Sequence, residues 1–118
     1  MLKIRAEQMD AFSAYMRKQF EDRMVEHLRS RFPRAVRHMQ EEELRELVRK
    51  GVKRAEGYGV TQEFDVRRYL ECTVEHGADF DVNPATAWAG KILSAEGLSG
   101  SAKMDRIDEY ETFALRGP

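Results

Sequence analysis

The sequence predicts an all-α protein, a compact bundle of about five helices with a long N-terminal helix and a C-terminal helical arm. Apolar residues recur at three- and four-residue spacing through most of the chain, which is the period of one helix face. No strand pattern interrupts this periodicity. Glycines, prolines and capping residues divide it at intervals that suit short connections between packed helices.

The first predicted helix runs from about Ala6 to Arg31 and would span about 39 Å at 1.5 Å per residue. This length allows it to project beyond a small domain, to bend, or to pair with a second copy. Its amphipathic stripe is typical of a core face. Phe32 and Pro33 end the helix, because the residue before a proline avoids helical torsions. The stripe consists of Met9, Phe12, Met16, Phe20, Met24 and Leu28.

The second helix is expected from about Gln40 to Tyr58 and the third from about Gln62 to His76. Gly51, inside the second helix, costs about 1 kcal/mol relative to alanine, which predicts that another helix crosses closely there. Glycines end both helices, and Thr61 is the expected N-cap of the third. The apolar face of the second helix comprises Leu44, Leu47, Val48, Val52 and Ala55.

The next segment begins like a calcium-binding loop but does not continue as one. Asp79, Asp81 and Asn83 alternate as the first EF-hand ligands do, yet Pro84 and Gly90 stand where that loop needs glycine and glutamate. We therefore expect these side chains to cap a short helix around Trp88, with Phe80 fixing the loop to the core. A minor hypothesis keeps Asp79, Asp81 and His76 as a metal or enzyme site.

The C-terminal part is expected to form a separate unit. Residues 1–95 make the helical bundle domain, and residues 96–118 make a flexible connection followed by a helical arm from about Ala102 to Leu115. This arm carries the acidic residues Asp108, Glu109 and Glu111. It is expected to dock on the basic region near Arg31, to fray, or to reach a neighbouring molecule.

Composition excludes several classes of function. Net charge is −1, which argues against a general nucleic-acid binder, and no run of about 18 apolar residues predicts a membrane span. The single Cys72 and the absence of a signal-peptide pattern favour the cytoplasm. Charge is uneven: residues 1–60 hold 14 Lys or Arg and 10 Asp or Glu, whereas residues 61–118 hold 6 and 11. This asymmetry favours solvated faces or complementarity between halves or chains.

No catalytic, cofactor-binding or metal-binding constellation is predicted, and we do not expect an enzyme. His27, His38 and His76 lack the i, i+4 spacing of a helical zinc site. Neither a nucleophile elbow nor a phosphate-binding glycine loop is present. The candidate residues are instead partner-binding ones on the two charged segments, namely Arg29, Arg31, Arg34, Arg37, Asp108, Glu109 and Glu111.

Two segments, EEELRELVRKGVKRAEGYGVTQEFDVRRYL and GADFDVNPATAWAGKIL, resemble small all-helical accessory proteins encoded in bacterial type VI secretion and polymorphic-toxin gene clusters. The resemblance covers about residues 4–95 and lies mostly in GYGVTQEFDV and DFDVNPATAWA. It implies a cytoplasmic adaptor or chaperone for a secreted toxin or spike component, and no enzymatic residues. An immunity protein that blocks a cognate toxin is the nearest alternative. A self-associating helical structural or regulatory module is the second, so a homo-oligomer is also possible.

Overall fold

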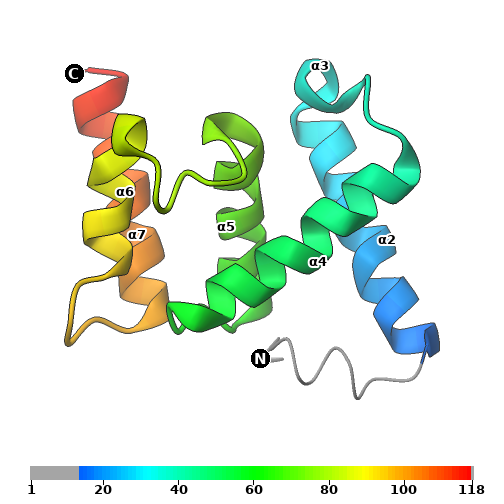
Figure 1. Cartoon of the computed structure of the whole chain (residues 1–118), viewed down its shortest axis with the longest axis horizontal. Helices are drawn as coiled ribbons and strands as arrows, with labels where there is room; N and C mark the ends of the chain where they lie inside the picture. Colours follow the sequence, from blue (N-terminus) through cyan, green and yellow to red (C-terminus); the bar gives the residue numbers. More distant parts are fainter. Residues whose placement is uncertain (1–13, 118) are drawn as a thin grey trace.

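The computed structural model describes residues 14–117, which form six α-helices and no strand (Figure 1). The all-α prediction is therefore confirmed, and five of these helices have seven or more residues. The predicted start of the first helix, Ala6 to Ser13, lies outside the described residues. None of the described helices combines the length and apolarity that crossing a bilayer requires. The helices are α2 (Ala14–Arg31), α3 (Pro33–Val36), α4 (Glu41–Gly57), α5 (Glu63–His76), α6 (Ala87–Leu93) and α7 (Gly100–Tyr110).

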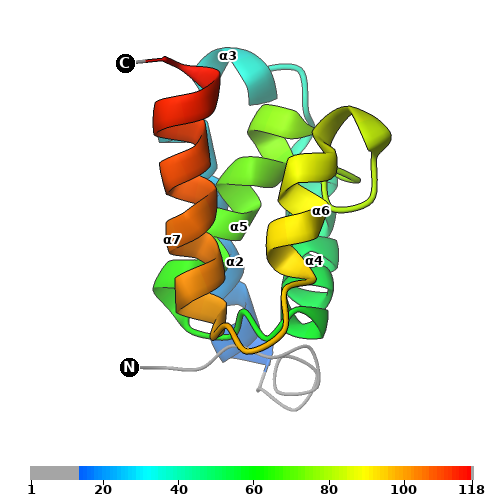
Figure 2. The same cartoon turned by 90° about the vertical axis from the view of Figure 1, so that its left-hand side faces the viewer.

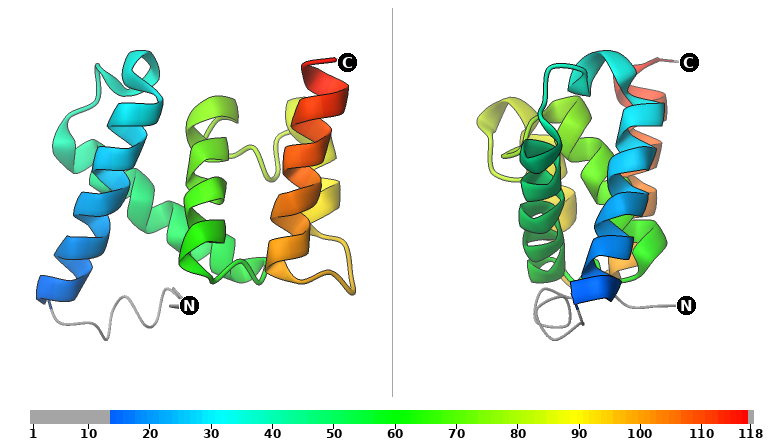
Figure 3. Two further views of the ribbon diagram at one scale, coloured as in Figure 1. Left: turned by 180° about the vertical axis from the view of Figure 1, so that it is seen from behind. Right: turned by 90° about the vertical axis from the view of Figure 1, so that its right-hand side faces the viewer.

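The longer helices stand in two layers on either side of α5. Figure 1 shows α2, α5 and α7 upright in a row, with α4 running obliquely from the top of α2 to the base of α5. In the side views of Figures 2 and 3, α2 and α7 lie on one side, and α4 and α6 lie on the other. Helix α4 packs against both α2 and α5, while α7 packs against α5 and α6. Helix α4 thus connects α2, at one end of the molecule, to α5, against which α7 packs at the other end.

The apolar stripe of α4 is the centre of the core, as its spacing predicts. Leu44, Val48, Val52 and Ala55 are buried, whereas Leu47 is only half-buried at the edge of the stripe. These residues belong to one apolar cluster with buried side chains from every other long helix, including Phe20, Leu28, Leu70, Leu93 and Ile107. Burial of apolar area is the main contribution to the stability of such a bundle.

Gly51 is a point of close approach between α4 and α5. A Cβ atom built at this position would lie 2.3 Å from Cδ2 of Leu70. The close crossing expected from a glycine inside a helix is therefore confirmed. Because Leu70 is itself fully buried, its side chain fills the space that any larger residue at position 51 would need.

Several helix ends agree with the sequence, and one differs. Gly77 closes α5 with a φ of 106°, and its N–H donates to the carbonyl of Thr73. Asn83 precedes the short 3₁₀-helix η1 (Pro84–Thr86) and accepts a hydrogen bond of 2.9 Å from the N–H of Ala85, as predicted. Thr61 is not the N-cap of α5, because the helix begins one residue later and Gln62 takes that position.

The C-terminal arm starts earlier than predicted and packs into the core. Ser99 caps α7 by accepting from the N–H of Ala102, so the Gly-Ser-rich stretch is already helical from Gly100. Met104 and Ile107 are fully buried in the same apolar cluster as the residues of α4 and α5. The last turn, η2 (Glu111–Leu115), is π-helical. The face of α7 that carries Met104 and Ile107 is thus part of the bundle's interior.

Two glycines, Gly59 and Gly100, bring the start of α7 against the turn between α4 and α5, residues 58–62. A Cβ atom on Gly100 would lie 2.3 Å from the carbonyl oxygen of Gly59 and 2.9 Å from Cα of Val60. Lys103 then donates from Nζ to the carbonyl of Tyr58 at 2.8 Å. Because the obstructing atoms belong to the backbone, a side chain at position 100 requires movement of a helix or of the turn.

We predict that Gly100→Ala lowers the free energy of unfolding by about 1–3 kcal/mol, the usual cost of overpacking. Gly57→Ala is the matched control, because a Cβ atom there meets nothing within 4 Å. It should be neutral or stabilising, since alanine is the better helix former. Urea unfolding followed by far-ultraviolet circular dichroism measures both values. Equal midpoints for the two variants would contradict this account of the turn.

Candidate partner-binding groove

A groove with a volume of about 750 Å³ lies between α4 and the C-terminal end of α5. Its floor includes Met39, Leu47 and Gly51 from the α4 side, and Thr73 and Ala78 from the α5 side. The groove is partly open to solvent rather than enclosed, so it can admit a segment of a larger partner. The rim is charged throughout, with Glu42, Glu43 and Glu46 toward the start of α4 and Lys50, Lys53 and Arg54 toward its end.

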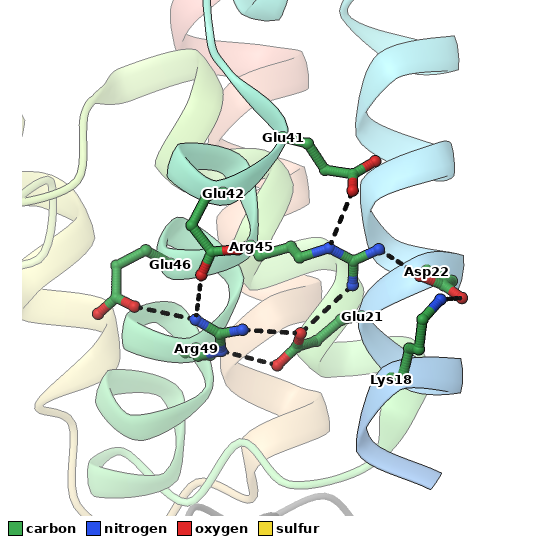
Figure 4. A network of polar contacts seen from close by, with 8 residues as sticks. All are labelled: Lys18, Glu21, Asp22, Glu41, Glu42, Arg45, Glu46 and Arg49. Atoms are coloured by element: carbon green, nitrogen blue, oxygen red, sulfur yellow. Dashed lines mark hydrogen bonds and ion pairs between the residues drawn. The ribbon is translucent and has the colours of Figure 1, made fainter. Parts of the chain in front are cut away.

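The acidic part of this rim belongs to an ion-pair network that joins α4 to α2 (Figure 4). Glu21 of α2 accepts hydrogen bonds from Arg49 at 2.8 and 3.1 Å and from Arg45 at 3.3 Å. Arg49 also contacts Glu42 at 3.0 Å and Glu46 at 3.2 Å. Arg45 reaches Asp22, which in turn accepts from Lys18. Two of the groove's three acidic residues, Glu42 and Glu46, are thereby fixed to the α2–α4 interface.

Glu21 is the buried centre of the network, with only 4% of its side chain exposed. A buried carboxylate without partners would cost several kcal/mol, so the two guanidinium groups are needed to hold it. The hydrogen bonds with Glu21 in turn raise the pKa of Arg49 above its ordinary value. The position of α4 against α2 therefore depends on this group of charges.

The basic end of the rim is connected to the loop after α5. Arg54 donates to Asp81 at 2.5 Å, and the Tyr58 hydroxyl donates to the same carboxylate at 2.6 Å. Burial alone would raise the pKa of Asp81, but these two hydrogen bonds outweigh it and hold the pKa below its ordinary range. Burial and the contact with Asp81 raise the pKa of Tyr58 to about 12, so its hydroxyl remains a donor at neutral pH. Lys50 and Lys53 form no ion pair with any residue in 14–117.

The four basic candidates from the sequence lie around α3 and do not line the groove. Arg31, Arg34 and Arg37 are exposed, and Arg29 is half-buried. The guanidinium of Arg31 lies over the ring of Phe32 at 5.1 Å, and Arg37 donates to His38 at 3.3 Å. This basic corner, residues 29–38, ends beside Met39, the first residue of the groove.

Two of the three acidic candidates, Asp108 and Glu111, contact α5 rather than the basic corner. Asp108 pairs with Arg68 at 2.7 Å, and Glu111 is buried and lies 2.7 Å from His76. Glu109 is exposed and lines a second, shallower hollow beside Phe113. Two of the three residues therefore serve contacts between helices in the described part of the chain.

Asp79, Asp81 and His76 do not form the site suggested by the minor hypothesis. Asp81 is occupied by Arg54 and Tyr58, and Asp79 accepts from the Asn83 amide at 3.3 Å. Burial raises the pKa of the Cys72 thiol, with the charges of Glu111 and Glu75 adding to the effect, so this cysteine stays protonated at neutral pH.

The groove was not predicted from the sequence. Leu47 and Met39 have the spacing or the apolarity of core residues, and only their half-exposure in the structure distinguishes them from such residues.

Comparison with protein-family models, curated proteins and solved structures found no match to this chain. The candidate site therefore rests on the residues that line the groove and on their contacts.

We predict that Glu21→Gln lowers the free energy of unfolding by about 1–3 kcal/mol, because the two arginines lose their shared buried charge. Lys18→Gln is the control at the edge of the same network. Its side chain is 69% exposed, so its ion pair with Asp22 contributes little. Thermal and urea unfolding of both variants measure the difference. Similar losses in the two variants would mean that the buried carboxylate has no special role.

We also predict that part of the acid sensitivity comes from Asp81. Because its pKa is lower folded than unfolded, where it is about 3.9, its contribution is complete above about pH 5 and is lost progressively as pH falls below that value. Asp81→Asn should therefore be much less stable than wild type at pH 7, and this difference should shrink below pH 4. Melting temperatures between pH 7 and pH 3 measure it. Parallel curves for the two proteins would exclude this explanation.

Proposed function

We propose that this protein is a non-enzymatic, protein-binding accessory factor that holds a helical segment of its partner in the α4–α5 groove. The main support for this proposal is the groove itself, which is partly open, has an apolar floor, and has a rim with an acidic half and a basic half. An amphipathic helix is the natural occupant, since its apolar stripe can lie on Met39 and Leu47 while its polar face stays in water.

Charge complementarity gives the orientation of the bound segment. Acidic residues of the partner would lie against Lys50 and Lys53, which are exposed and unpaired within residues 14–117. Glu42 and Glu46 are already paired with Arg49, so they offer less to a partner. The basic end of the groove is therefore the stronger electrostatic anchor.

The partner class comes from the resemblance of residues 4–95 to accessory proteins of type VI secretion and toxin gene clusters. On this proposal the protein acts in the cytoplasm as an adaptor or chaperone for a secreted toxin or a spike component. The groove suits such a role, because it would shield an apolar helix of the cargo before delivery.

We expect Lys50→Glu with Lys53→Glu to weaken binding of a purified toxin or spike component, encoded beside this chain, by at least about tenfold. Reversing two rim charges replaces attraction with repulsion and leaves the core intact. Lys91→Glu, at an exposed position of α6, is the control and should bind like wild type. Isothermal titration calorimetry measures the three affinities.

A second variant tests the rival surface. If Arg34→Glu with Arg37→Glu abolishes binding while the groove variant binds normally, the basic corner is the interface and the groove proposal is wrong.

The same proteins distinguish the nearest alternative role. An immunity protein would protect cells from the active toxin, whereas an adaptor or chaperone would change the toxin's solubility or loading.

A further inference from the structure

The end of α5 and the start of η2 bring three metal-ligating side chains together. Glu75 and His76 are the last two residues of α5, and Glu111 begins the π-helical turn after α7. One ligand atom from each residue lies within 4.8 Å of the others. Nε2 of His76 is 2.7 Å from Oε2 of Glu111. These residues are distant in sequence and are brought together only by the packing of α7 on α5.

The chemistry of the three ligands matches a borderline divalent metal ion. Imidazole nitrogen and carboxylate oxygen are ordinary zinc ligands at about 2.0–2.2 Å, whereas magnesium and calcium prefer oxygen alone. Tetrahedral ligands at such distances lie about 3.4 Å apart. Metal binding therefore requires the His76–Glu111 contact to lengthen from 2.7 Å and to lose its shared proton, and it requires Glu75, the more exposed of the two carboxylates, to rotate toward them.

The charges around the cluster also fit a cation. Two carboxylates and a neutral imidazole together carry a charge of −2, which one divalent ion would neutralise. The nearest competing cation is Arg116, whose Nη2 lies 3.7 Å from Oε2 of Glu75, and whose side chain is 60% exposed. Such an exposed and loose pair contributes little and is easily displaced.

We propose that Glu75, His76 and Glu111 bind one divalent transition-metal ion of the zinc class, with the remaining coordination positions open to water. This site does not depend on the groove or on any partner. Its occupation would join the end of α5 directly to the last turn of the described chain.

A second histidine–glutamate pair in the protein serves as a control for this proposal. His27 of α2 and Glu71 of α5 form a similar pair, with Nε2 and Oε2 2.6 Å apart. Among residues 14–117, however, no third ligand completes a cluster around that pair. A histidine–glutamate contact alone should therefore bind metal much more weakly than the three-ligand cluster.

The fluorescence of Trp88 can report metal binding at His76. Its ring lies edge-on to His76 with the centroids 5.4 Å apart, and it is the single tryptophan of the sequence. A paramagnetic ion bound to His76 would quench its fluorescence, because the ion and the indole would be near contact.

The experiment titrates the untagged full chain with Co²⁺, follows Trp88 fluorescence, and then adds Zn²⁺ as a competitor. We expect saturable quenching at one equivalent, reversed by Zn²⁺, with a cobalt absorption spectrum of low coordination number. His76→Gln and Glu75→Gln should each weaken binding at least tenfold, whereas His27→Gln should behave like wild type.

Circular dichroism establishes that each variant is folded. Glu75→Gln keeps the size of a side chain that is 28% exposed, so it remains decisive if His76→Gln does not fold. The proposal is overturned if wild type shows no saturable quenching near one equivalent. It is equally overturned if Glu75→Gln binds like wild type, or if His27→Gln weakens binding as much as His76→Gln.

Discussion

The burial of the Glu21 carboxylate between Arg45 and Arg49 is the constraint on which much of the molecule depends. A charge removed from water must have partners in defined positions, so α2 and α4 have one preferred register. Hydrophobic contacts alone tolerate small sliding movements, because they have little directionality. Arg49 also holds Glu42 and Glu46 at the groove, so the internal charge network also shapes an outer surface.

Helix α4 meets its two neighbours through opposite kinds of contact. Toward α2 it combines its apolar stripe with charged side chains, and toward α5 it presents Gly51, where the Leu70 side chain reaches the helix backbone. The first contact specifies register through directional hydrogen bonds, and the second specifies distance through the absence of a side chain. Between them they leave Leu47 half-exposed, which is why a groove forms beside α5.

Sequence periodicity predicted the helices well, because it reports directly which face each helix buries. Leu44, Val48 and Val52 are core residues as their spacing indicates, and Gly51 marks a close crossing. The π-helical turn and the Ser99 cap have weaker local signals and were missed. The cluster of Glu75, His76 and Glu111 had none, because it forms only when residues 35 positions apart meet. Likewise, the acidic side chains of the last helix find partners on α5, which charge counting along the chain cannot reveal.

The contact between Gly100 and the Gly59–Val60 backbone has a consequence for folding while the chain is being synthesised. The α4–α5 turn emerges from the ribosome before its partner helix has been synthesised. Until residues 100–107 follow, the Tyr58 carbonyl lacks the Lys103 ammonium, and the core lacks Met104 and Ile107. The nascent chain therefore exposes the apolar edge of α5 for the time needed to translate some 40 residues, roughly 2–8 s at 5–20 residues per second. Slower translation of that stretch would prolong the interval in which the unfinished bundle can aggregate.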